Sequence, residues 1–183
     1  MGYYADAGSH RDEVSFPAYG PIDSLFGFVV FYIFIERATP TIVDVFSTVT
    51  AMAPSTIGFG LAGLLWFIFV VTVLDVGRRQ LAAVGVGSDD SIAESNRQRG
   101  VPSVPRALFY LGVVAIGGVV AVLTFETAVE TGIDMIRIVG TLDTSGFDLV
   151  GFVVMILFFV SFGAATRALD RVVIGGVRAL LSW

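Results

Sequence analysis

The chain has 183 residues, of which 55% are hydrophobic, and its sixteen acidic residues outnumber its eleven arginines, so the formal net charge is −5. This balance argues against nucleic-acid binding, because no basic stripe is present to neutralise phosphates. With no cysteine and one histidine, His10, the chain also lacks the residues for a histidine-based catalytic or metal site. An enzyme is therefore the least favoured class, and no cofactor is expected.

Four apolar stretches follow a polar segment at residues 1–20. The first covers residues 24–35 and can begin a helix at Pro21, while residues 45–74, 107–125 and 149–166 carry no charge at all. The mean hydropathy is +0.84, and about 20 apolar residues are enough for a helix to cross a bilayer. The sequence therefore predicts an all-α integral membrane protein with four transmembrane helices, and the lipid bilayer is its first partner.

The two halves of the chain form an internal repeat. In each half, a Thr-x-Gly-Phe element lies where a short amphipathic segment meets a long apolar one. The matched residues are Thr56, Ile57, Gly58, Phe59 and Gly60 in the first half and Thr144, Ser145, Gly146, Phe147 and Asp148 in the second. Further pairs are Glu36 with Glu126, Asp44 with Asp134, Gly63 with Gly151 and Arg79 with Arg167. This order predicts two membrane repeats, at residues 21–84 and 106–166.

The connection within the first repeat has the pattern of a short separate helix. Thr39 can cap a helix that starts at Pro40, and apolar residues then recur at helical spacing as far as Ala53 and Pro54. We therefore expect each repeat to consist of a helix, a short re-entrant helix, a Gly-Phe loop and a second helix.

The matching connection in the second repeat is acidic. Glu126, Glu130 and Asp134 recur every four residues, and Arg137 lies one turn beyond Asp134 as its expected partner. Because no proline interrupts this segment, continuation of the third span as one long helix is the alternative to a re-entrant helix.

Arginines orient the chain and mark its remaining segments. They gather between the second and third spans and after the fourth, whereas the two opposite connections hold only Arg37 and Arg137. By the positive-inside rule, both termini and the polar linker at residues 85–105 are expected in the cytoplasm, or in the interior of a virion. Residues 167–183 fit a C-terminal amphipathic helix in the membrane interface, with Trp183 as an anchor, or a membrane helix that simply protrudes.

The order helix, short helix, Thr-x-Gly-Phe-Gly, helix resembles the pore unit of potassium channels, and two units in tandem resemble two-pore-domain channels. The resemblance implies a filter whose backbone carbonyls replace the hydration shell of a monovalent cation such as potassium. Its filter candidates are residues 56–60 and 144–148, its hinge candidate is Gly163, and it implies a homodimer. The second element has one glycine and is closer to the loops of Trk-type potassium transporters.

An alternative interpretation assigns no pore. The glycines then belong to turns that open the following helices, with Ser55, Thr56, Asp143 and Thr144 as caps. Small residues within the spans let membrane helices approach closely; they are Gly63, Gly112, Gly117, Gly118 and Gly151. The chain is then a non-catalytic scaffold, either a subunit of a larger membrane complex or an envelope protein of a halophilic virus. An acidic, lysine-free composition resembles haloarchaeal proteins and fits both interpretations.

Overall fold

The computed structural model describes residues 18–83 and 102–181. Its helices, in chain order, are α1 (Pro21–Thr50), α2 (Pro54–Ala83), α4 (Val104–Thr141), the short 3₁₀-helix η1 (Thr144–Gly146) and α5 (Leu149–Leu181). The described part of the chain contains no strand. The four α-helices are each long and apolar enough to cross a membrane. The predicted all-α protein with four potential membrane spans is thus confirmed, and the chain is an integral membrane protein by length and composition.

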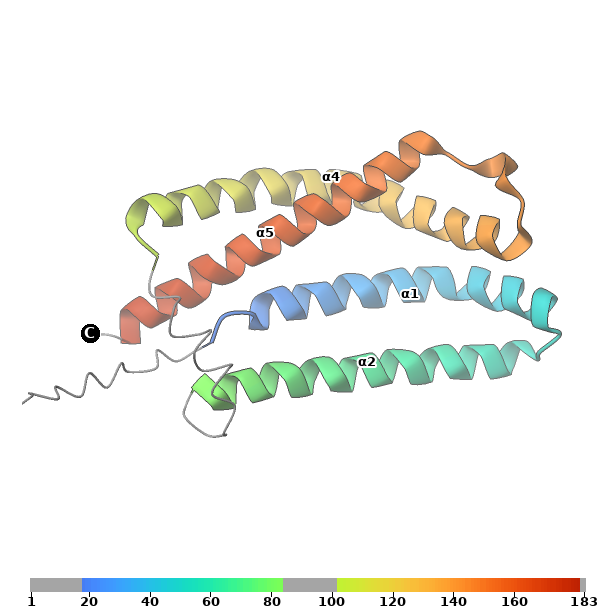
Figure 1. Cartoon of the computed structure of the whole chain (residues 1–183), viewed down its shortest axis with the longest axis horizontal. Helices are drawn as coiled ribbons and strands as arrows, with labels where there is room; N and C mark the ends of the chain where they lie inside the picture. The colour runs from blue at the N-terminus through green and yellow to red at the C-terminus, as the bar shows by residue number, and fades with distance from the viewer. Residues whose placement is uncertain (1–17, 84–101, 182–183) are drawn as a thin grey trace, which may run out of the picture.

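The helices form two hairpins that lie against each other (Figure 1). Helices α4 and α5 pack most extensively, α1 packs against all three other long helices, and among the described helices α2 packs against α1 only. We call the end where α1 begins, α2 ends, α4 begins and α5 ends the terminal end. The opposite end, with the connections at residues 51–53 and 142–148, is the loop end. The likeness between the hairpins therefore lies in helix order and not in the extent of packing.

The core lies where α1 crosses the second hairpin. Ala121, Ala128 and Phe158 are buried there, and Phe34 and Phe125 pack around them. Phe34 and Phe125 meet edge to face, with ring centroids 6.2 Å apart, which is a favoured aromatic geometry. Bulky rings from three helices thus fill the space between the hairpins.

Glycines allow the closest helix contacts. At Gly117 in α4, an added Cβ would lie 3.0 Å from the backbone oxygen of Ser161 in α5. At Gly151, it would lie 2.6 Å from the Thr131 hydroxyl oxygen. Two of the five glycines expected to mediate close contacts therefore do so, whereas a Cβ at Gly63, Gly112 or Gly118 would meet nothing within 4 Å.

The structure differs from the expected re-entrant helix in the first repeat. Helix α1 continues through Pro40 to Thr50, so residues 40–50 extend the first span. Pro40 has no backbone donor for the Glu36 carbonyl one turn back, and membrane helices tolerate the loss of one such bond. The Thr39 hydroxyl donates to the Ile35 carbonyl at 2.6 Å, one turn back, so Thr39 lies inside the helix and does not cap a new one.

The second hairpin has continuous helices as well. Helix α4 runs unbroken from Val104 to Thr141, which is the long-helix alternative for the acidic connection. Helix α5 runs from Leu149 to Leu181, so residues 167–181 continue the last span as one protruding helix and are not a separate interfacial element. The described helices therefore have no break at Pro40, in the acidic connection or at residue 167, and at the last two places this is the alternative that the sequence left open. The linker at residues 85–105 lies largely outside the described residues, as do residues 1–17 and Trp183.

Candidate functional site

Residues 56–60 lie in the first two turns of α2. The helix starts at Pro54, and the Ala53 carbonyl accepts hydrogen bonds from the backbone N–H groups of Thr56 at 2.9 Å and Ile57 at 3.4 Å. A Cβ at Gly58 or Gly60 would meet nothing within 4 Å, and the Phe59 side chain is 83% exposed. The segment is thus helical at both glycines, and Ser55 and Thr56 lie within the first turn and not at the cap position.

Residues 144–148 form a polar turn that opens α5. Asp143 caps η1, because its side chain accepts a hydrogen bond from the Ser145 N–H at 3.0 Å. Hydrogen bonds from the side chain and the backbone of Ser145 hold the pKa of the Asp143 carboxyl below its usual value. Asp148 caps α5 in the same way, accepting from the Val150 N–H at 2.9 Å. Asp143 was expected to cap the following long helix and caps η1 instead, Thr144 lies inside η1, and the cap of α5 is Asp148, which the sequence did not indicate because the repeat aligned it with Gly60.

The two Thr-x-Gly-Phe elements share the loop end but are not packed together. Neither η1 nor α5 packs against α2 among the described residues. Gly163, the hinge candidate, lies inside an unbroken part of α5, where a Cβ would meet nothing within 4 Å. Within one chain, the structure therefore keeps the candidate filter residues on separate hairpins.

Two ion pairs stabilise the helices, one near the middle of α1 and α4 and one nearer the loop end of α4. Arg37 of α1 donates two hydrogen bonds to the Glu126 carboxylate of α4, one of them 3.1 Å long from Nη2 to Oε1. Such bidentate pairs fix geometry as well as charge. The expected partnership of Arg137 with Asp134 is confirmed, at 3.1 Å. The contact between Arg37 and Glu126 was not predicted, although Glu126 is the repeat counterpart of Glu36, the residue next to Arg37.

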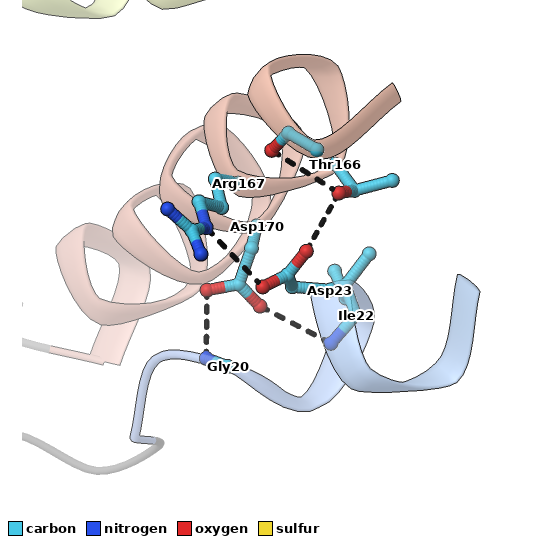
Figure 2. Close-up of polar contacts among 7 residues, drawn as sticks. Gly20, Ile22, Asp23, Thr166, Arg167 and Asp170 are labelled. Atoms are coloured by element: carbon cyan, nitrogen blue, oxygen red, sulfur yellow. Dashed lines mark hydrogen bonds and ion pairs between the residues drawn. The ribbon is translucent and has the colours of Figure 1, made fainter. Parts of the chain in front are cut away.

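A polar cluster that the sequence pattern did not predict lies at the terminal end. Figure 2 shows the Asp170 carboxylate of α5 accepting hydrogen bonds from the backbone N–H groups of Gly20 at 2.7 Å and Ile22 at 3.1 Å. Asp23 accepts from the Thr166 hydroxyl at 2.6 Å and lies 3.9 Å from the Arg167 guanidinium. We call these six residues the terminal clamp.

The terminal clamp caps α1 from another helix. Asp170 is only 3% exposed, and the N-cap residue of α1, Gly20, makes no side-chain cap because it has none. The first N–H groups of a helix need an acceptor, and the negative charge also suits the helix N-terminus. Asp170 of α5 therefore supplies the side-chain acceptor that Gly20 cannot provide.

Aromatic contacts extend this packing along α5. The Arg178 guanidinium lies 4.1 Å from the centroid of the Tyr19 ring, and Arg178 is 2% exposed. Arg171 donates to the Tyr110 hydroxyl at 2.6 Å and lies over the same ring. Burial raises the pKa of the Tyr19 phenol, so this side chain stays neutral around physiological pH. The segment that precedes α1 is thus held against α5 by stacking as well as by hydrogen bonds.

A scan against protein-family models, a search of curated proteins and a search of solved structures each found no match to this chain.

Proposed function

We propose that this chain is a non-catalytic four-span membrane scaffold that acts as a subunit of a larger membrane assembly. The observation that carries the proposal is the helical state of residues 56–60. Inside an α-helix, the carbonyls of Thr56 and its neighbours accept helix hydrogen bonds, so they do not converge on an ion. The long, continuous helices of both hairpins likewise suit a structural role.

The one-sided packing of α2 supports an assembled state. Among the described helices α2 has α1 as its only packing partner. Its other side exposes Phe59 at 83%, Trp66 at 66% and Phe67 at 66%. In a bilayer these rings contact lipid or the helices of partner subunits. The assembly is a homodimer or a larger complex, in a cell membrane or in the envelope of a halophilic virus.

A pore-loop cation channel is the second candidate. The observation that favours it is that both Thr-x-Gly-Phe elements lie at the loop end, each before or within the start of a hairpin's second helix. Two chains would be needed to bring four such elements around one axis. The first element would also have to leave its helical state in the assembled protein.

Potassium flux into liposomes tests the two functions. A scaffold gives no flux above that of empty liposomes at any voltage or pH, and Gly58→Val inserts and assembles as the wild type does. A pore gives flux that Gly58→Val abolishes, because a filter glycine adopts a backbone conformation that a Cβ forbids. Gly118→Val is the matched control, since a Cβ at either glycine meets nothing within 4 Å. Selective flux from the wild type that only Gly58→Val removes would overturn the scaffold.

A further inference from the structure

A groove runs between α1 and α2 in the half of the hairpin near the terminal end. It is an open groove with a volume of about 400 Å³, which is in the range of small-molecule sites. Its walls include Phe28 and Phe31 from α1 and Ile68 and Val71 from α2. The groove lies on helices that are long and apolar enough to be embedded in a bilayer, so a lipid can reach it from the side.

The groove is most polar at one end; Thr72 also lines it, but its hydroxyl donates to the Ile68 carbonyl of its own helix at 2.8 Å. Ser24 and Asp75 line it near the terminal end, where α1 begins and α2 approaches its last turns. Phe31 lies seven residues further along α1 than Ser24, which places it about 10 Å deeper. The lining therefore changes from hydrogen-bonding to apolar with increasing depth, as the two parts of one membrane lipid would require.

Asp75, which lines the groove, and Arg79, which lies one helical turn beyond the lining toward the terminal end, define the head group that fits. The Asp75 carboxylate lies 2.7 Å from the Arg79 guanidinium, and both side chains are about half exposed, at 53% and 47%. A carboxylate only accepts hydrogen bonds, whereas a guanidinium only donates them and matches phosphate geometry. A head group with a phosphate for Arg79 and free hydroxyls for Asp75 complements both groups.

We propose that this groove binds one phospholipid whose head group carries a phosphate and free hydroxyls, as in phosphatidylglycerol. The phosphate accepts hydrogen bonds from Arg79, and the head-group hydroxyls donate to Asp75. One acyl chain of the lipid lies between Phe28, Phe31 and Ile68. Basic residues between membrane helices bind anionic head groups in the same manner. The site goes beyond a scaffold function and does not depend on it.

Filling the groove tests the site. A Cβ at Gly27, which lines the groove, meets nothing within 4 Å, so Gly27→Phe projects a ring into the space without striking the backbone. Gly118→Phe is the control, because its Cβ also meets nothing within 4 Å and α4 does not line the groove. Each protein is released from nanodiscs that contain equal amounts of phosphatidylglycerol and phosphatidylcholine, and retained lipid is counted by native mass spectrometry.

The wild type and Gly118→Phe should retain one phosphatidylglycerol, and Gly27→Phe should weaken retention about tenfold. Arg79→Gln should retain lipid but lose the preference for phosphatidylglycerol over phosphatidylcholine. Free glycerol phosphate should not compete with the lipid, because the acyl chain of the lipid makes most of the contact with the groove. If Gly27→Phe does not fold by circular dichroism, Ile68→Trp fills the same groove and replaces it. Equal retention by the filled and control variants, or no retention by the wild type, would overturn the proposal.

Discussion

Gly140 in α4 forms a notch for the Val45 side chain of α1, near the loop end. A Cβ at Gly140 would lie 1.9 Å from Val45 Cγ1 and 3.3 Å from Val45 Cβ, and Val45 is only 7% exposed. Because valine has no flexible end to move away, the Gly140→Ala variant must shift α1 against α4. We expect it to lose about 1–3 kcal/mol of unfolding free energy, measured by titration with a denaturing detergent.

Gly118→Ala is the control for this prediction, because its Cβ meets nothing within 4 Å. It should leave stability unchanged or raise it by up to about 1 kcal/mol, since alanine is the better helix former. Adding Val45→Ala to Gly140→Ala should recover part of the loss. Equal stability of Gly140→Ala and Gly118→Ala would contradict the notch.

Ala51 ends α1 in a left-handed conformation, with φ at 54°. This conformation costs a residue with a Cβ about 1–2 kcal/mol, whereas glycine adopts it freely. Ala51→Gly should therefore raise the unfolding free energy by about 1 kcal/mol. The matched control is Ala62→Gly, an exposed position inside α2, where the same substitution should lower it by about 1 kcal/mol. Destabilisation by both variants to the same extent would show that Ala51 is not strained.

At the scale of the element, the terminal clamp replaces a missing helix cap with a side chain from another helix. Asp170→Ala leaves the N–H groups of Gly20 and Ile22 without their acceptor, which should cost about 1–3 kcal/mol. Hydrogen exchange at these two amides should become faster, because the start of α1 loses its anchor. Asp170→Asn keeps one acceptor oxygen and should have a smaller effect.

Asp134→Ala is the control for the clamp, because Asp134 also pairs with an arginine but is 58% exposed. Exposed ion pairs contribute less than about 1 kcal/mol, and exchange at Gly20 and Ile22 should stay at its wild-type rate. Similar losses from Asp170→Ala and Asp134→Ala would mean that the clamp adds no more than a surface pair.

Helix type and number followed from the sequence, but helix ends did not. The charge-free stretches required by a bilayer are long and unambiguous, so all four helices were predicted. Pro40 was interpreted as the start of a new helix, because in water a proline inside a helix is costly. Membrane helices tolerate an internal proline because neighbouring helices and small local adjustments lower that cost, and α1 continues through Pro40.

At the scale of the whole molecule, the sequence predicted local contacts better than distant ones. The pair of Asp134 and Arg137 is three residues apart and was predicted, whereas Asp170 and Gly20 are separated by 150 residues. Nothing in the local pattern indicates which helix supplies the cap for Gly20. The repeat alignment does not provide it either, because α2 and α5 occupy different packing environments in spite of their aligned residues.

The distribution of arginines predicts how the whole molecule lies in the membrane. Among the described arginines, only Arg37 and Arg137 lie in the half of their helix nearer the loop end; those in the half nearer the terminal end are Arg78, Arg79, Arg106, Arg167, Arg171 and Arg178. Positive charge is retained on the cytoplasmic side during insertion, so the terminal end should face the cytoplasm.

Single cysteines can test this orientation without background, because the chain has none of its own. Ala53→Cys places a thiol in the connection at the loop end, and Ser103→Cys places one just before α4 at the terminal end. A membrane-impermeant maleimide should label Ala53→Cys in intact cells and Ser103→Cys only after permeabilisation. The opposite pattern would mean that the terminal end faces the outside. Labelling of both thiols in intact cells would mean that the chain inserts in two orientations and that the arginine difference does not control its orientation.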